Sequence, residues 1–295
     1  MSSYATIRTH GVADAQAVPS FILRAAVICE PPLMKLTPAQ ARAHADEVRA
    51  TSITILKGLI PTDIIDTWRE AFGPLLAASI RCERDRPGRG PHRYYLPLPF
   101  HGLWADPAII DNDAIMAVVE ELVGADGVLC QFATDTPLLG SELETLRSEG
   151  PPLFPEARAE TPPYQLAVNF PLVDVTDDAG PMEYAPGTHM LASDDGMARV
   201  ERGEIPLVKA CLARGDVMIR DVRHLHRGTP NRSSKPRPMV VVGYSRPWLR
   251  RPDASIRIPA DVLVALPPRA RRWLRHNPVF ASRAEADESW RALAS

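Results

Sequence analysis

The sequence predicts a mainly β protein with helices on both flanks of the β region, built as an antiparallel sandwich or barrel. Between Gly127 and Ser245, short apolar segments alternate with Pro, Gly and Asp, which is typical of antiparallel strands joined by turns. Before and after this region, apolar residues recur at helical spacing. A parallel sheet would instead need strands that alternate with long crossover helices.

Helices and a few strands are predicted in the first part of the chain. Thr37 followed by Pro38 is a typical helix start, with a polar cap and a proline at the first helical position. A second helix carries apolar residues on one face at Ile65, Trp68, Phe72 and Leu75. The predicted elements are a helix from Thr37 to Ala50, a strand at 52–59, a helix at 61–80, a strand at 93–97 and a helix at 114–123, capped by Asp113 and ended by Gly124.

The central part of the chain is predicted to form the sheets. The strands are expected at 128–133, 164–173, 181–185, 206–212, 215–221 and 238–245. Residues 140–161, rich in Pro, Glu and Ser, predict a long loop over one mouth of the β region. Helices are expected at 260–274 and 283–293. The simplest division is one domain, with an N-terminal part at 1–126, a β core at 127–250 and a helical extension at 251–295.

Composition excludes several classes of function. Hydrophobic residues make up 45% and charged residues 24% of the chain, with a formal net charge of −2, so nucleic acid and anionic membranes are not expected partners. The four cysteines are scattered singly, and residues 1–20 are too polar for a signal peptide. We therefore expect a cytoplasmic protein whose partner is a small-molecule substrate or ligand.

One motif is more informative than the others. From Gly215-Asp216, a predicted strand runs out to His226, turns tightly near Asn231 and returns with Arg237. Five further segments precede it in the chain: Leu56 to Pro61, Arg93 to Phe100, Gln131 with 136–141, 172–182, and Pro186 to His189. Together these segments resemble the phytanoyl-CoA dioxygenase family of iron(II)/2-oxoglutarate-dependent oxygenases, and the resemblance spans about Ile53 to Tyr244. It implies a double-stranded β-helix, the cupin-like jelly roll.

The resemblance also implies iron(II) and 2-oxoglutarate as cofactors. In such enzymes two histidines and one carboxylate hold the metal, and His226 matches the second histidine. Arg237 matches the residue that binds the far carboxylate of 2-oxoglutarate, a task that suits a planar and permanently charged guanidinium. Gln131 and Asn231 are expected at the cofactor as well. His189 is expected in the scaffold of the site, and His44-Ala45-Asp46 on the surface of the first helix.

The sequence departs from the family pattern at the remaining iron ligands. A His-x-Asp is expected before a Leu-Phe-Pro segment, but the chain has Arg147 and Glu149 at those positions. A guanidinium has no lone pair to donate to a metal. We therefore expect the metal site to be lost and no cofactor to be bound, with Glu149 paired to Arg147 or Arg220. Arg147, Glu149 and His226 would then form a charged acid–base cluster, suited to cyclisation, isomerisation, elimination or hydrolysis of a small organic molecule such as a natural product.

Two alternatives stay open. The first is an active iron(II)/2-oxoglutarate hydroxylase with a rearranged metal site made of Glu149, His224 and His226. The second is a non-catalytic protein that binds a ligand or pairs with an active paralogue, for which apolar surface near Trp104 or Trp248 would serve. A homodimer is compatible with each reading.

Overall fold

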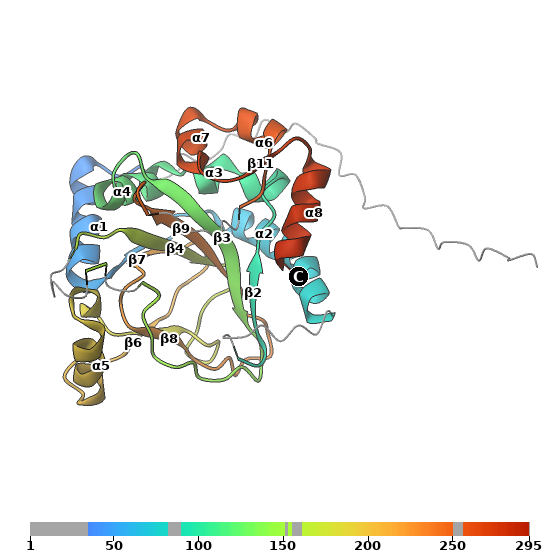
Figure 1. Cartoon of the computed structure of the whole chain (residues 1–295). Coiled ribbons are helices and arrows are strands. Elements are labelled where there is room, and N and C mark those ends of the chain that lie inside the picture. The colour runs from blue at the N-terminus through green and yellow to red at the C-terminus, as the bar shows by residue number, and fades with distance from the viewer. Residues whose placement is uncertain (1–34, 82–89, 151–152, 155–160, 250–255, 295) are drawn as a thin grey trace, which may run out of the picture. The chain divides into compact units, whose positions relative to one another are not determined.

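The computed structural model describes residues 35–81, 90–150, 153–154, 161–249 and 256–294 of the chain (Figure 1). All of them belong to one compact unit, Leu33–Ser295. The signal-peptide expectation for residues 1–20, two of the cysteines (Cys29 and Cys82) and part of the loop at 140–161 lie outside the described residues. The boundaries at 126 and 250 stay predictions.

Two antiparallel sheets form the centre of the fold. The large sheet has the strand order β1-β7-β4-β9-β3-β2, and the small sheet has the order β6-β5-β8. The large-sheet strands are β1 (Ile53–Leu56), β2 (Arg93–Pro97), β3 (Val128–Pro137), β4 (Gln165–Pro171), β7 (Val217–Asp221) and β9 (Met239–Ser245); those of the small sheet are β5 (Met182–Tyr184), β6 (Val208–Ala210) and β8 (His226–Gly228). This architecture, a jelly roll with flanking helices, confirms the predicted fold class.

Each strand of the large sheet turns alternate residues to opposite faces, because side chains in a strand have a period of two. On β7, Val217 and Ile219 join the main apolar core, whereas Met218 packs in a second cluster with Met239 of β9 and residues of the small sheet. Arg220, two residues after Met218, lies on the same face of the strand as Met218. The alternation therefore places a buried arginine, only 5% exposed, in the space between the sheets.

The helices cover the other face of the large sheet. Trp68 of α2 makes edge-to-face contacts with Phe132 of β3 and Phe170 of β4, at centroid distances of 6.2 and 5.5 Å. Around the sheet the helices are α1 (Pro38–Thr51), α2 (Thr62–Arg81), α3 (Pro107–Ile110), α4 (Asp113–Val123), α5 (Ser193–Glu201), α6 (Ala260–Ala265), α7 (Pro268–Leu274) and α8 (Arg283–Ala294) (Figure 1). Two short strands, β10 (Ile258–Pro259) and β11 (Val279–Phe280), pair in parallel near the C-terminus.

Several predicted elements differ from the structure in detail. The expected helix at 260–274 is divided into α6 and α7, because Pro267 and Pro268 interrupt the helical hydrogen bonds. Asn112, not Asp113, caps α4, and its side chain accepts hydrogen bonds from the backbone of Ala114 and Ile115. The sequence does not predict α5 or the three-residue strand β8.

The order of elements around the principal motif also needs correction. Strand β7 ends at Asp221, and His226 begins β8 in the other sheet instead of extending β7. Arg237 lies just before β9, not on it. Trp104 is 6% exposed and belongs to the core, so of these two tryptophans it is Trp248, at 56%, that provides apolar surface. No helix in the described part of the chain is long and apolar enough to cross a membrane.

Candidate functional site

A cavity with about 610 Å³ of space between atoms, part of it open to solvent, lies between the two sheets. Polar and charged residues line one part of it and methionines another. Its lining includes Tyr95, Gln131, Asp135, Glu144, Arg147, Glu149, Asn169, Met182, Met218, Arg220, His226, Gly228, Arg237, Met239 and Val241. The catalytic residues expected from the sequence are thus brought together, along with Gln131 and Arg237.

Arg147 reaches this cavity because its segment pairs with the edge of the small sheet. The main chains of Arg147 and His226 exchange two hydrogen bonds of 3.0 and 2.9 Å, an antiparallel bridge beside β8. The guanidinium turns to Glu144, with Nη2 3.1 Å from Oε1. Glu144 also accepts a 2.8 Å hydrogen bond from the backbone of Gly228. Arg147 is therefore neutralised by Glu144 and not by Glu149.

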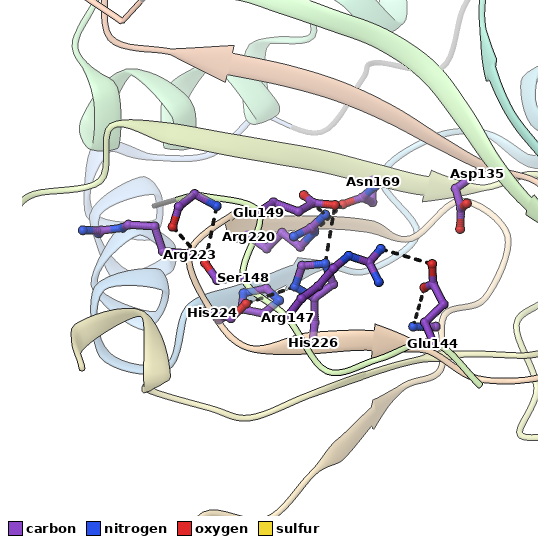
Figure 2. Close-up of polar contacts among 12 residues, drawn as sticks. Asp135, Glu144, Arg147, Ser148, Glu149, Asn169, Arg220, Arg223, His224 and His226 are labelled. Carbon is purple, nitrogen blue, oxygen red and sulfur yellow. Dashed lines mark hydrogen bonds and ion pairs between the residues drawn. The ribbon is translucent and has the colours of Figure 1, made fainter. Parts of the chain in front are cut away.

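Glu149 lies between Arg220 and His226 (Figure 2). Its Oε2 accepts a hydrogen bond of 3.1 Å from Arg220 Nη2, and its Oε1 lies 3.5 Å from His226 Nε2. Arg220 was one of the two partners that the sequence predicts for Glu149. Its Nε also donates to Asn169 Oδ1 at 3.1 Å. Two fixed contacts thus orient the guanidinium, and the guanidinium in turn orients the carboxylate.

The hydrogen bonds of His226 restrict where its protons sit. The ring Nδ1 lies 3.0 Å from the main-chain oxygen of His224, and a carbonyl oxygen can only accept, so Nδ1 carries a hydrogen. The other ring nitrogen, Nε2, faces the Glu149 carboxylate. A proton on either of these two groups would be directed at the other group. The pair can both give and take a proton.

His224 packs against this site without joining it. Its side chain is fully buried, its ring centroid lies 5.0 Å from that of His226 and 5.7 Å from that of Tyr184, and neither ring nitrogen has a hydrogen-bond partner among the described residues. Burial, and after it the charges of His226 and Arg220, holds the pKa of His224 well below its ordinary value. His224 is therefore neutral at physiological pH.

Arg237 lines the same cavity at a different place. It donates a 2.7 Å hydrogen bond from Nη2 to the main-chain oxygen of Gly180, and no described residue accepts from Nε. Burial lowers the pKa of Arg237 to about 10, so the guanidinium stays charged at neutral pH. Gln131, also in the lining, donates to the Tyr95 hydroxyl.

Asn231 does not line the cavity, although the sequence suggests a cofactor-binding role for it. Its side-chain amide donates to the main-chain oxygens of Pro137 and Lys235, at 2.9 and 2.8 Å, and its Oδ1 accepts from Ser233. Both the amide nitrogen and the amide oxygen of Asn231 are therefore engaged in hydrogen bonds that stabilise the turn before β9. His189 likewise contacts the backbone of Arg49 through Nε2, at 3.1 Å, and has the scaffold position that we expected.

The residues present do not fit the iron centre that the family implies. His226 and Glu149 supply two donors, but the third position belongs to Arg147, which has no lone pair. In the described part of the chain, no three His, Cys, Asp or Glu side chains are grouped so that they could hold a metal ion. This includes the rearranged set of Glu149, His224 and His226.

The structure adds polar residues to the site that the sequence did not place there, among them Asn169 and Glu144. Neither Asn169 nor Glu144 belongs to a recognisable sequence motif, because a single amide or carboxylate is common on any strand or loop. Arg220 was identified only as a pairing partner. A stronger signal was available: on β7, Arg220 follows three apolar residues and lies on the same face of the strand as Met218.

Comparisons with known proteins agree with this fold. Residues 103–239 match the family model of phytanoyl-CoA dioxygenase (PhyH). A solved structure of the non-heme α-ketoglutarate-dependent epimerase SnoN from nogalamycin biosynthesis is 20% identical, with a TM-score of 0.55 over 71% of this chain and 84% of that chain. The carbocyclase SnoK from the same biosynthesis is 15% identical, with a TM-score of 0.53 over 72% and 87%. AviO1 from Streptomyces viridochromogenes Tue57 is 18% identical, with a TM-score of 0.56 over 72% and 97%. At these identities the solved structures show the shared fold, and the match to the phytanoyl-CoA dioxygenase family model covers residues 103–239 of the chain.

Proposed function

We propose that this protein is a metal-independent enzyme that moves protons on a small organic molecule bound between the two sheets. The observation that carries the proposal is the Glu149–His226 pair, at 3.5 Å, beside an arginine in the position of a metal ligand. Isomerisation, cyclisation, elimination and hydrolysis all need such proton transfers and no redox step. SnoN and SnoK are named as an epimerase and a carbocyclase of natural-product biosynthesis, which supports a natural product as substrate.

The contacts around the pair support this role. The main-chain oxygen of His224 fixes one nitrogen of the His226 ring, so the other nitrogen stays directed at Glu149. Arg220 fixes the carboxylate from the opposite side. A proton donor and a proton acceptor are thus held together in a mostly buried place, where catalytic groups work best when their geometry is set in advance.

Electrostatics also favour the metal-independent reading. The Arg147 and Arg220 side chains both line the cavity, and each repels a cation. Two unit charges at 4 Å repel by about 4 kcal/mol at an effective dielectric constant of about 20, and a dication doubles this. Glu144 and Glu149 offset part of the repulsion, but only while they remain paired with these arginines.

An iron(II)/2-oxoglutarate hydroxylase is the second candidate, and Arg237 is the observation that favours it. This guanidinium lines the cavity, and among the described residues its hydrogen-bond partner is a main-chain oxygen, so a carboxylate could bind there. SnoN has been solved in complex with Fe³⁺ and α-ketoglutarate. We rank this candidate second because the iron ligands are incomplete.

The two candidates can be separated by one assay. Chelator-treated protein is incubated in D₂O with a panel of polyketide and aminoacyl natural products, and mass spectrometry detects isomers and incorporated deuterium. The proposal predicts deuterium exchange or isomerisation without added metal, and its loss in Glu149→Gln and in His226→Asn. Turnover that requires iron(II) and 2-oxoglutarate and yields a product with added oxygen would establish the hydroxylase instead.

A further inference from the structure

Arg220 has one hydrogen-bonding group that the protein itself does not use. Its side chain is 6% exposed. Nε donates to Asn169 and Nη2 donates to Glu149, but Nη1 is buried and no described residue accepts a hydrogen bond from it. Buried donors without an acceptor are rare in folded proteins, and a charged donor is the most demanding case. An oxygen atom from a ligand in the cavity could accept the hydrogen bond that Nη1 does not make within the protein.

The position of this donor is fixed before any ligand arrives. Because Nε and Nη2 are both held, the planar guanidinium cannot rotate, and the N–H bonds of Nη1 keep one direction. The acceptor it calls for is a neutral oxygen, since the Glu149 carboxylate already balances the charge of Arg220. A ketone or ester carbonyl meets this requirement, whereas a second carboxylate would repel Glu149.

The wall beside Arg220 is apolar. Met218 precedes it by two residues on the same face of β7, and Met182, Met239 and Val241 also line the cavity. Met218, Met239 and Met182 pack together in the cluster between the sheets. Methionine side chains are flexible and polarisable, and they adapt to irregular apolar shapes. This wall fits the carbon skeleton of a ligand that has few charges.

We infer that Arg220 binds the carbonyl oxygen of an apolar substrate and stabilises the enolate formed when the neighbouring carbon loses a proton. The inference rests on the proposed acid–base function. In that step the C–H bond breaks, the proton passes to Glu149, its electron pair forms a C=C bond, and the carbonyl electron pair moves to the oxygen beside Arg220. Return of a proton from Glu149, or from His226 beside it, restores the carbonyl.

The other arginines of the cavity suit this task less well. The Arg147 side chain is 33% exposed and is directed to Glu144, so water competes for it. Arg237 is charged and forms no salt bridge with a carboxylate of the described residues, so it suits an anion more than a neutral carbonyl. Only Arg220 combines a fixed guanidinium, an unused buried N–H and direct contact with the Glu149 carboxylate.

A phenolate serves as a stable stand-in for the enolate, and 4-nitrophenol reports its own ionisation by its visible absorption. In Glu149→Gln the carboxylate is replaced by a neutral isostere, as it is after proton transfer. We expect 4-nitrophenolate to bind this variant at least tenfold more tightly than it binds the double variant with Arg220→Met, and the bound dye to ionise at lower pH. The matched control is the double variant of Glu149→Gln with Arg237→Met, which should bind as Glu149→Gln does.

A second measurement needs no change at Arg220. In Glu149→Gln labelled with ¹³C-methyl methionine, 4-nitrophenolate should shift the methyl signals of Met182, Met218 and Met239 at the same concentrations that shift its absorption. Equal binding with and without Arg220, dependence on Arg237 alone, or unchanged methionine signals would each overturn the inference. Deuterium exchange by the wild-type protein tests the proposed function separately. Dye binding without deuterium exchange would refute the proposed acid–base function, but it would still support an oxygen-binding site at Arg220.

Discussion

Arg147 and Glu144 form an ion pair of 3.1 Å at the cavity between the sheets. We propose that Arg147 takes the place of the first histidine ligand of the family pattern. Its main chain pairs with that of His226 through two backbone hydrogen bonds, so an arginine at this position changes the side-chain chemistry and leaves that pairing in place. This makes the site suitable for restoring the ligands by substitution.

We predict that Arg147→His combined with Glu149→Asp creates a metal site. The two changes rebuild a His-x-Asp opposite His226, and they remove one cation from the cavity. Manganese(II) should bind to this variant with a dissociation constant in the micromolar range, about −8 kcal/mol, in isothermal titration. Arg147→Lys combined with Glu149→Asp is the matched control and should bind no better than the wild type. Equal binding by all three proteins would mean that Arg147 does not determine metal affinity.

Glu149→Gln should lower the rate of the proton-transfer reaction by about 10² to 10⁴, the usual contribution of a general acid–base group. The amide keeps the shape of the side chain but cannot take a proton. Glu144→Gln is the comparison, because Glu144 contacts Arg147 and the backbone of Gly228 and not His226. A loss of rate as large in Glu144→Gln would place the catalytic carboxylate elsewhere.

At the scale of single elements, the short strand β8 is held by close packing. A Cβ at Gly228 would lie 2.5 Å from Arg93 Nη1 and 2.5 Å from Glu144 Oε2, so both partners would have to move. Gly228→Ala should therefore lower the free energy of unfolding by about 1 to 3 kcal/mol, as overpacking usually does. Urea denaturation measures this.

Gly73→Ala in helix α2 is the matched control, since a Cβ there has no atom within 4 Å. Alanine is the better helix former by about 1 kcal/mol, so the control should be neutral or more stable. A Gly228→Ala protein as stable as the wild type would show that this packing is looser than the structure indicates.

Asp216 ties β7 to the segment after β1, and this contact predicts a dependence of stability on pH. Burial alone would raise its pKa, but hydrogen bonds from Lys57 and from the backbone of Gly58 and Ala213 outweigh burial and lower it. A carboxylate whose pKa is lower in the folded state stabilises the protein above its unfolded pKa, about 3.9. That stabilisation is lost as the pH falls through the folded-state value.

Asp216→Asn should therefore lower the free energy of unfolding at pH 7 by about 1 to 3 kcal/mol, and the difference from the wild type should shrink below about pH 4. Urea denaturation at a series of pH values tests both parts. An unchanged difference at acid pH would mean that the charge of Asp216 is not what stabilises this contact.

The elements that the sequence predicts well have strong local signals. Helix α1 has its capping box at Thr37 and Gln40, and the eight predicted strands are all present, although β3 runs on to Pro137. The three-residue strand β8 has no periodicity to detect, and its partners are far away in the sequence. The sequence predicts that Glu149 pairs with an arginine, because a carboxylate beside several arginines is stabilised by an ion pair. The Glu144–Arg147 pair depends on the course of a loop that no pattern reports.

At the scale of the whole molecule, the two sheets form a jelly roll with a cavity between them. Among the described residues, arginine–carboxylate contacts at or beside this cavity include Arg93 with Asp135, Arg147 with Glu144, and Arg220 with Glu149. The same architecture can therefore support a different chemistry, because the fold positions the cavity and the side chains decide the reaction. A small, largely apolar substrate with a carbonyl group agrees with both the methionine wall and the fixed arginine.

The central claim is that a permanently charged side chain replaces one iron ligand, and isothermal titration of the wild-type protein with manganese(II) or anaerobic iron(II) tests it most directly. Titrations are made with and without 2-oxoglutarate, and His226→Ala serves as the control. The account predicts no micromolar site and no difference between the two proteins. A stoichiometric site with a micromolar dissociation constant, lost in His226→Ala, would contradict it.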